Sequence, residues 1–299
     1  MNIGIIGCGG VGGYIGAKII QSYSAHVDMT ARGEHLKSIK KNGLEIIDED
    51  KTFKIPETYI NKTLNQDIKY DIVIFCTKTY DLENACEENL KFIDKSTLLL
   101  SLNNGVDNDL IIKKKFPGNS VAKGCIYILS NIKKPGVIKK YGGVFNLFFG
   151  TTEKKSDILE KFKAVLEKSS LKHRLSDNID YEIWRKFLLI SAFASLTSYY
   201  DITIGEIGAK HKNELSAILD EIILLANKKN IPLGEKEKEN VIKRVKTIPY
   251  ESTTSMLLDF RAKKKTELEA LCGYVVKEAE KVGLKVPVMS KIYEKLKTL

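Results

Sequence analysis

Residues 3–12 read Ile3-Gly4-Ile5-Ile6-Gly7-Cys8-Gly9-Gly10-Val11-Gly12, an apolar run that leads directly into a Gly-x-Gly-x-x-Gly motif. The small and apolar side chains of residues 13–20 indicate a helix packed closely on a sheet. In such a unit the first glycine makes a tight turn, the second admits a pyrophosphate and the third lets the helix approach the strand. A glycine-rich turn without a ligand is the alternative, but the strand before it and the helix after it favour a phosphate site at the helix N-terminus.

Strands and helices alternate in the first half of the chain. The strand candidates are short apolar runs, at residues 3–6, 25–30, 71–76, 97–102 and 120–124. Residues 82–92 and 108–115 have helical character. Runs that are apolar throughout, such as residues 72–75, are typical of parallel strands covered on both faces. We therefore expect a doubly wound, Rossmann-type α/β domain with right-handed crossovers.

The pattern changes after residue 126. Pro135-Gly136 predicts a turn, and residues 137–141 and 144–149 are expected to form a hairpin that turns at Gly142-Gly143. A helix over residues 156–169 is expected to close this first domain.

Strand signals almost vanish after residue 177. Helical periodicity covers residues 181–200, 215–228, 235–246 and 266–282, with breaks at Pro249, Gly283 and Pro287. We expect a cofactor-binding domain over residues 1–176 and an all-α domain over residues 177–299. Ligands of open α/β sheets lie outside the carboxyl ends of the strands, so the active site is expected in a cleft between the two domains. The apolar helices would serve either a homodimer interface or the core of their own domain.

Composition restricts the class of partner. The chain has 48 Lys and Arg against 38 Asp and Glu, a formal charge of +10. The lysines are dispersed among glutamates, as in residues 235–239, which is typical of a solvated helix surface. We therefore expect no nucleic-acid partner, because an anionic substrate and a phosphorylated cofactor use the same positive field.

The five cysteines are scattered and form no Cys-x-x-Cys pair, which predicts free thiols in a reducing compartment and no metal site. The chain shows no signal-peptide pattern and no apolar run near the roughly 20 residues that cross a bilayer. A cytoplasmic protein without a membrane partner is therefore expected.

The region after the second predicted strand indicates which dinucleotide is bound. An acidic residue at the strand tip favours NAD, and an arginine favours the 2′-phosphate of NADP. Arg32 lies near the expected tip, 20 residues after Gly12, whereas Asp28 falls inside the strand. We therefore predict NADP(H), with Arg32 on the phosphate; an ordinary loop arginine is the alternative.

Polar residues also follow the third and fourth main strands, where parallel strands open onto a ligand site. Lys78 follows one strand and can supply a cation to phosphate or ribose. Asn104 follows the next and can hold an amide or hydroxyl near a nicotinamide. Asn104-Gly105 alone reads as a turn, but together with the glycine motif these residues predict a cofactor site.

The helical half has one candidate acid. Lys186, in the run Trp184-Arg185-Lys186-Phe187, begins a long apolar helix, and a lysine directed into a cleft can act as a general acid. From these residues alone a surface lysine is the favoured interpretation. Ser255 and Glu267 likewise look like amphipathic-helix and capping residues.

Together these segments identify a resemblance along essentially the whole chain. They are Gly7–Gly12, Ala31-Arg32-Gly33, Thr77-Lys78, Asn104-Gly105, Trp184-Arg185-Lys186, Leu196-Thr197, Gly205-Glu206, residues 255–259 (Ser-Met-Leu-Leu-Asp) and Thr266-Glu267. In order and spacing the chain resembles the ketopantoate reductase (2-dehydropantoate 2-reductase) family. The glycine motif is shared with many dehydrogenases, whereas the combination with the later segments is specific.

The resemblance implies NADPH-dependent reduction of 2-dehydropantoate to (R)-pantoate, on the route to pantothenate and coenzyme A. It makes Lys186 the general acid and has Glu267 hold that lysine and the nascent hydroxyl. It assigns Ser255 to the substrate carboxylate and Asn104 to substrate and nicotinamide. The cofactor residues that it implies are Gly7, Cys8, Gly9, Gly10, Val11, Gly12, Arg32, Lys78, Asn104 and Glu267.

The chain departs from the family pattern at two positions. Members with ketopantoate activity usually carry asparagines four and eight residues after the helix lysine, where this chain has Ile190 and Ala194. Each lost contact to a buried substrate hydroxyl costs about 1–3 kcal/mol, unless Ser191 or Ser195 replaces it. Two alternatives stay open: an NADP-dependent reductase of a more apolar 2-oxo acid, and a cofactor-binding sensor without turnover. A sensor would not need the proton donor Lys186.

Overall fold

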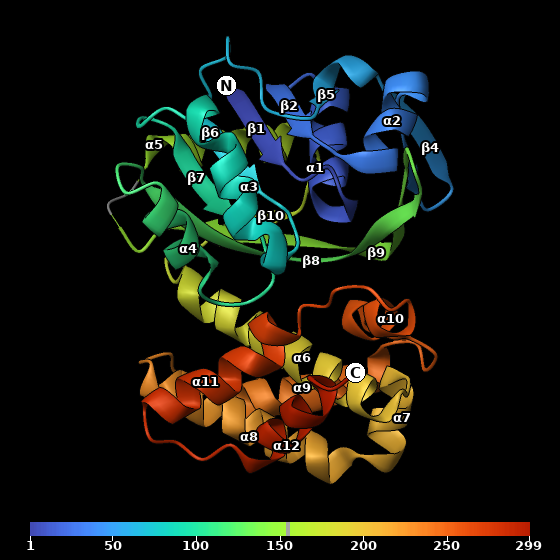
Figure 1. Cartoon of the computed structure of the whole chain (residues 1–299), viewed down its shortest axis with the longest axis vertical. Coiled ribbons are helices and arrows are strands. Elements are labelled where there is room, and N and C mark those ends of the chain that lie inside the picture. The colour runs from blue at the N-terminus through green and yellow to red at the C-terminus, as the bar shows by residue number, and fades with distance from the viewer. Residues whose placement is uncertain (154–155) are drawn as a thin grey trace. The chain divides into compact units, whose positions relative to one another are not determined.

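The computed structural model describes residues 1–153 and 156–299 and divides into two compact units (Figure 1). The sheet unit comprises Met1–Asn103 and Asp107–Ile179, and the helical unit comprises Asn104–Val106 and Asp180–Leu299. The short segment after β7 therefore belongs to the helical unit, although the chain around it belongs to the sheet.

The sheet unit is built on a mixed sheet with the strand order β4-β3-β9-β8-β7-β6-β1-β2-β5 and with β10 beside β9. Its strands are β1 (Asn2–Ile6), β2 (His26–Thr30), β3 (Leu44–Asp48), β4 (Lys51–Ile55), β5 (Ile60–Asn61), β6 (Ile72–Phe75), β7 (Leu98–Ser101), β8 (Val121–Lys134), β9 (Val137–Gly150) and β10 (His173–Leu175). The strands from β8 through β7, β6, β1 and β2 to β5 are parallel. The α/β class is confirmed, and the carboxyl ends of β2, β1 and β6 come to one edge with β1 in the middle.

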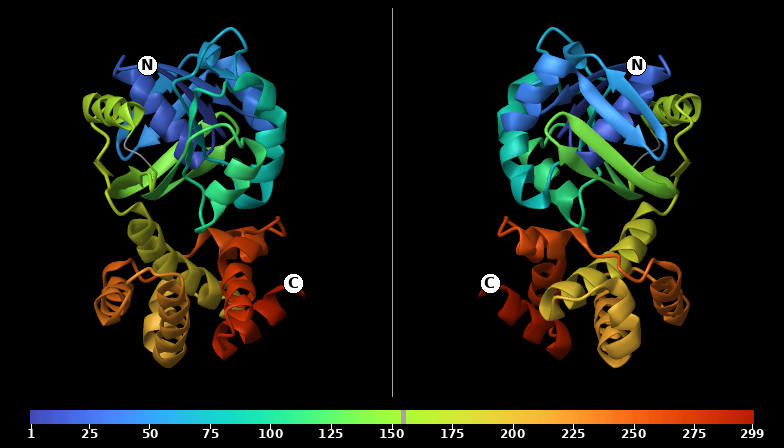
Figure 2. Two further views of the ribbon diagram at one scale, coloured as in Figure 1. Left: turned by 90° about the vertical axis from the view of Figure 1, so that its left-hand side faces the viewer. Right: turned by 90° about the vertical axis from the view of Figure 1, so that its right-hand side faces the viewer.

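Both faces of the parallel strands are buried, because successive side chains enter different cores. Ile72 and Ile74 of β6 join one core, which includes residues of α1 (Gly10–Gln21) and α5 (Asp157–Lys168). Val73 and Phe75 join the opposite core, beneath α3 (Leu82–Asn89) and α4 (Asn108–Lys115). The two helix layers are visible in Figure 2. The uniformly apolar strands are thus explained by cover on both sides.

One strand expectation is wrong. Residues 137–149 do not fold back at Gly142-Gly143, because β9 runs through them as a single strand antiparallel to β8. The pairing shifts from Ile128 opposite Phe145 to Ser130 opposite Lys140, so the glycines form a bulge, where Gly142 takes a φ of +61°. The reversal lies at Pro135-Gly136, as predicted.

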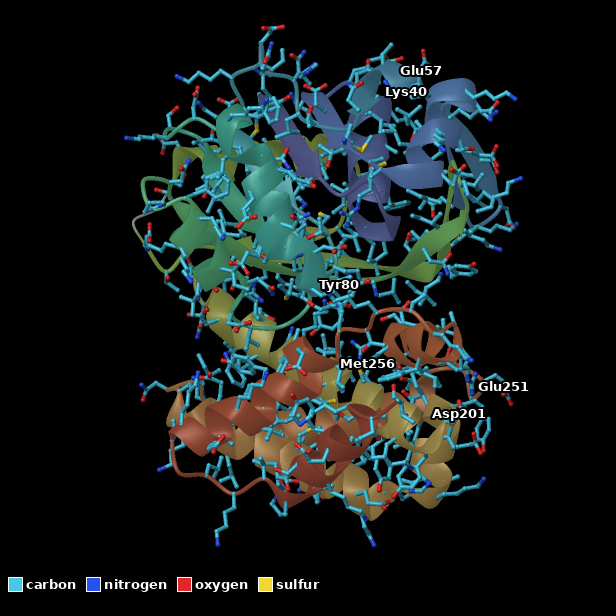
Figure 3. The ribbon with its side chains drawn as sticks, viewed as in Figure 1. Lys40, Glu57, Tyr80, Asp201, Glu251 and Met256 are labelled. Atoms are coloured by element: carbon cyan, nitrogen blue, oxygen red, sulfur yellow. The ribbon has the colours of Figure 1, made fainter. Side chains whose placement is uncertain are left out.

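Several elements of the sheet unit were not expected. They are α2 (Gly33–Asn42), the antiparallel β3–β4 pair, the short strands β5 and β10, and the 3-10 turns η1 (Glu57–Tyr59) and η2 (Thr79–Asp81). The helical segment predicted over residues 82–92 consists of α3 and the 3-10 turn η3 (Leu90–Phe92). Lys40 of α2 donates to the carbonyl of Glu57 at 3.3 Å and thereby ties α2 to η1 (Figure 3).

The helical unit contains α6 (Ile179–Tyr200), α7 (Ile204–Lys210), α8 (Lys212–Lys228), α9 (Glu235–Thr247), α10 (Ser255–Arg261), the π-turn η4 (Glu269–Gly273), α11 (Tyr274–Lys281) and α12 (Pro287–Leu296). Their apolar faces form one core within this unit. The all-α expectation is confirmed. The amphipathic helix expected at residues 255–259 is α10, while α7 and α12 were not predicted. A homodimer stays a prediction.

Among the described residues no single helix is long and apolar enough to span a membrane. The bent pair α6 and α7, angled at 82°, passes the length and composition test only when the two helices are taken together.

Candidate active site

The glycine loop lies between β1 and α1 in the sheet unit. Gly10 and Gly12 are closely packed against backbone, whereas the space next to Gly9 is open. Gly7 adopts a φ of +104°, which favours glycine. A Cβ on Gly12 would lie 2.3 Å from the carbonyl oxygen of Gly7, and one on Gly10 would lie 2.4 Å from that of Ser130. A Cβ on Gly9 would meet nothing within 4 Å. Gly7, Gly10 and Gly12 are thus required by packing, whereas the space above Gly9 is where the motif would receive a pyrophosphate.

Three side chains outside the motif hold the loop. Thr30 accepts hydrogen bonds from Gly7 N–H through its hydroxyl (3.1 Å) and from Cys8 N–H through its carbonyl (2.7 Å). His35 contacts the Cys8 carbonyl at 2.9 Å, and Ser130 donates to the Gly10 carbonyl at 2.8 Å. The first N–H groups of α1 have no intrahelical acceptor, so the anchored loop presents them for an anion. The described geometry therefore fits a dinucleotide.

Sequence reasoning missed Thr30, His35 and Ser130. Ser130 was invisible because its contact depends on the β8–β9 pairing. His35 follows Arg32 by only three residues, and this proximity was the available signal.

His35 bonds on both sides of its ring. Gly136 N–H donates to His35 Nδ1 at 3.0 Å, so Nε2 carries the proton that bonds the Cys8 carbonyl. Burial lowers the pKa of His35, and the bond to Cys8 opposes this shift.

Cys8 serves the loop through its backbone. Its side chain is buried, and burial raises the pKa of the thiol to about 12. All five cysteines lie among the described residues and are free thiols. No cluster of three or more His, Cys, Asp or Glu side chains suited to a metal occurs in the part of the chain that the structure describes.

Asp28 is committed to the interior of the sheet unit. It lies within β2, is 7% exposed, and accepts hydrogen bonds from Tyr70 Oη at 2.7 Å and from His26 Nε2 at 3.0 Å. Arg32 follows β2 at the start of α2, with 60% of its side chain exposed. Arg32, and not Asp28, is therefore exposed near the end of β2, where the sequence places it.

Two residues after β6 approach the same edge. Lys78 directly precedes η2, and Asp81 ends it. The Asp81 carboxylate forms an ion pair and hydrogen bond with the Arg32 guanidinium. This partner of Arg32 was not foreseen, although Asp81 stands only three residues after Lys78. Figure 3 labels Tyr80, which lies between them in η2.

The helical unit brings together three of the predicted site residues. Lys186 Nζ donates to Asn104 Oδ1 at 2.8 Å, and Asn104 Nδ2 donates to Glu267 Oε2 at 3.1 Å. Lys186 is 7% exposed and Glu267 is 4% exposed. The amide of Asn104 thus bridges a buried cation and a buried carboxylate, and these two partners fix which way the amide is turned. We call these three residues the Lys186 cluster.

The neighbours of Lys186 on α6 have structural tasks. Trp184 is buried and packs edge-on against Phe187 and Tyr274. Arg185 pairs with Glu182 one turn earlier, with an N–O distance of 2.6 Å. Since the residues on either side of it are anchored elsewhere, Lys186 is presented toward Asn104.

Ser255 is the first residue of α10, directly before Met256 (Figure 3). The preceding Thr254 caps this helix by accepting from Leu257 N–H at 3.3 Å. The Thr254 hydroxyl lies 2.7 Å from that of Thr197 near the end of α6. The role of Ser255 stays a prediction, but its helix is tied to the helix that carries Lys186.

Ser191 and Ser195 do not replace the missing asparagines. Both are fully buried and face η4: Ser191 donates to the Leu271 carbonyl at 3.4 Å, and Ser195 donates to the Ser191 carbonyl at 2.7 Å. Ile190 and Ala194 lie four and eight residues after Lys186 and share its side of α6. Ala194 is buried in the core of the helical unit, and Ile190 is partly buried against that core, so both positions carry apolar side chains in place of the asparagines.

Comparison with known proteins agrees with this arrangement. Family models described as "Ketopantoate reductase PanE/ApbA" and "Ketopantoate reductase PanE/ApbA C terminal" match residues 3–154 and 178–299. The chain belongs to the ketopantoate reductase family. It is an oxidoreductase of that family, with the α/β and all-helical parts expected from the resemblance.

Individual relatives are distant but match over at least 96% of both chains. The chain is 26% identical to "Uncharacterized oxidoreductase YkpB" of Bacillus subtilis (strain 168), covering 98% of this chain and 96% of the relative. The crystal structure of 2-dehydropantoate 2-reductase from Porphyromonas gingivalis W83 is 28% identical over 99% of both chains, with a TM-score of 0.85. A complex of D-mandelate dehydrogenase with NADH is 25% identical over 98% of this chain and 97% of the other, also with a TM-score of 0.85.

Proposed function

We propose that this chain catalyses NADPH-dependent reduction of a 2-oxo acid to a 2-hydroxy acid, with 2-dehydropantoate as the first candidate substrate and (R)-pantoate as its product. The observation that carries the proposal is the Lys186 cluster, in which a buried ammonium, an amide and a buried carboxylate are joined by hydrogen bonds. A non-catalytic sensor has no need of such a donor set.

The cluster suits the charge that develops during the reaction. Hydride addition to a carbonyl carbon places negative charge on the oxygen. A lysine ammonium within hydrogen-bond reach stabilises that oxygen and then donates its proton to form the hydroxyl. Lys186 has this role in the proposal, and its lost proton is restored from solvent.

Asn104 and Glu267 would prepare Lys186 for this step. Asn104 holds the ammonium through Oδ1, and Glu267 accepts from the same amide, so the three groups share one defined orientation. A carboxylate close to a lysine favours its charged form, which is the form that donates a proton. Asn104 would also contact the nicotinamide and the substrate, Glu267 the nascent hydroxyl and the cofactor, and Ser255 the substrate carboxylate.

The glycine loop would hold the cofactor, which supplies the hydride when bound. The N-terminal N–H groups of α1 and the space above Gly9 would take the pyrophosphate. Arg32, aided by Lys78, would contact the 2′-phosphate of NADPH. The structure of the relative D-mandelate dehydrogenase in complex with NADH supports a nicotinamide dinucleotide at this site.

A second candidate is reduction of a more apolar 2-oxo acid. It is favoured by Ile190 and Ala194, whose apolar side chains offer a substrate hydroxyl no hydrogen bond at the two positions where family members with ketopantoate activity usually carry asparagines. D-mandelate dehydrogenase, whose name denotes a 2-hydroxy acid with a phenyl group, shares this fold.

The test is NADPH oxidation at 340 nm with the purified full-length chain. The panel is 2-dehydropantoate, 2-oxoisovalerate, which lacks its hydroxymethyl group, and benzoylformate. Saturable turnover fastest with 2-dehydropantoate supports the first candidate, and turnover fastest with either apolar acid supports the second. NADPH binding without turnover of any 2-oxo acid would overturn both and leave the sensor.

A further inference from the structure

The Arg32–Asp81 ion pair spans the end of the central strand. Arg32 follows β2 and Asp81 follows β6, and these strands flank β1 without touching each other. Since all three strands are parallel, the two side chains meet above the carboxyl end of β1, where the glycine loop begins. A dinucleotide held by that loop would have its adenosine ribose at this pair.

We infer that Asp81 is a cofactor-specificity residue that weakens the preference for NADPH which Arg32 alone would give. The inference rests on the proposed dinucleotide site. A carboxylate on Arg32 occupies part of the guanidinium that a 2′-phosphate would bind in a fork-like, bidentate manner. It also repels the phosphate, which carries close to two negative charges near neutral pH. A ribose 2′-hydroxyl, by contrast, can donate a hydrogen bond to the same carboxylate.

Charge and exposure support this role. The pair is accessible, with 60% of the Arg32 side chain and 30% of the Asp81 side chain exposed. Exposed ion pairs contribute little to folding, so replacing Asp81 leaves the fold intact. Lys78 directly precedes η2, three residues before Asp81, and adds a second positive charge to this segment. We therefore expect the wild-type chain to accept both NADPH and NADH.

The experiment uses Asp81→Asn in the full-length chain, which removes the charge and keeps the size of the side chain. Calorimetry gives the affinities for adenosine 2′,5′-bisphosphate and for 5′-AMP, two probes that differ by the 2′-phosphate alone. Steady-state assays then give kcat/KM with NADPH and NADH. We expect the variant to raise the preference for the phosphorylated form about tenfold in both measurements, as expected from removing one nearby like charge.

Glu87→Gln is the matched control. Glu87 lies on α3, the helix that follows Asp81, and its exposed carboxylate forms an ion pair with Lys115, so the substitution removes the same charge in a similar setting. Its preference should equal that of the wild type. An unchanged or lowered preference in Asp81→Asn, with both probes still binding, overturns the inference and makes Asp81 a residue that orients Arg32 for phosphate. If neither probe binds the wild type, the proposed dinucleotide site fails and the inference fails with it.

Discussion

The glycine loop and the Lys186 cluster are constructed in opposite ways. The loop is a contiguous stretch of six residues whose features are backbone conformation, close packing and N–H groups at a helix start. The cluster consists of three side chains that stand far apart in the chain, with Asn104 separated by 82 residues from Lys186 and by 163 from Glu267. A loop of this kind can be recognised from a short stretch of sequence, whereas the cluster forms only once the helical unit has folded.

The difference predicts how each region responds to substitution. In the loop, an added methyl group either collides with backbone or enters space meant for a ligand. In the cluster, truncation removes a charge or a hydrogen bond but leaves the surrounding helices packed. Stability and cofactor binding should therefore change with the loop, and turnover with the cluster.

The largest effect is expected for Lys186→Ala. Loss of the proton donor should lower kcat about 1,000-fold, within the range known for general acids, while the dissociation constant for NADPH changes little. Steady-state turnover assays give kcat, and fluorescence titration with NADPH gives the dissociation constant. Lys210→Ala, which removes an exposed lysine on α7, is the control and should retain wild-type turnover. Equal loss of binding and turnover in Lys186→Ala would contradict the assignment.

Next in size is the contrast between Gly12→Ala and Gly9→Ala. The first places a Cβ 2.3 Å from the Gly7 carbonyl and should reduce the free energy of unfolding by about 1–3 kcal/mol. The second has open space around its Cβ and an extended backbone (φ −90°), so its melting temperature should stay near that of the wild type. Gly9→Ala should nevertheless lose most NADPH affinity. Thermal melts and titrations separate the two, and normal binding by Gly9→Ala would refute a pyrophosphate above this residue.

The same contrast explains how much could be predicted from the sequence. The strands β1, β2, β6 and β7 and the helix α4 were predictable because apolar runs and helical periodicity are local. The mistaken turn at Gly142-Gly143 arose because a glycine pair is also suited to a bulge, and only pairing with β8 decides between them. The strands β3, β4 and β5 are short and carry charged residues, so their apolar signal is weak.

The site residues also divide into those that local sequence reveals and those that it does not. Arg32 and the glycines were found from spacing, whereas Lys186, Glu267 and Ser255 looked like ordinary helix residues until a family resemblance gave them roles. Asp81 and Ser130 were not singled out at all, because their partners are 49 and 120 residues away in the chain. Long-range contacts of this kind have no local signature.

A smaller effect is expected for Ile190→Asn, which restores a polar group one helical turn beyond Lys186. If the substrate lies along this side of α6, a new hydrogen bond to its hydroxyl should contribute about 1 kcal/mol and raise kcat/KM for 2-dehydropantoate about fivefold. The same change should lower kcat/KM for 2-oxoisovalerate. Ile190→Leu keeps the side chain apolar and should leave the ratio of the two unchanged. If Ile190→Asn leaves the ratio of the two kcat/KM values unchanged, the substrate does not lie along this side of α6.

The smallest effect is expected on the pH dependence of stability, through His35, which contacts the Cys8 carbonyl of the glycine loop. Burial lowers the pKa of His35 below its ordinary value of 6.5, so the unfolded chain takes up a proton more readily than the folded one. The stabilising contribution of neutral His35 is therefore complete above about pH 6.5 and declines as the pH falls toward the lowered pKa. Protonation would also turn Nδ1 from an acceptor of the Gly136 N–H into a donor facing it.

His35→Gln tests this argument, because its amide can still donate to the Cys8 carbonyl but does not titrate in this range. Melting temperatures between pH 5 and pH 8 should fall on acidification more steeply for the wild type than for the variant. At pH 7.5 the variant should be slightly less stable, by about 1 kcal/mol, since the Gly136 N–H loses its acceptor. Parallel curves for the two proteins would assign the acid sensitivity to another group, such as one of the remaining three histidines among the four in the chain. The glycine loop would then be insensitive to the protonation of His35.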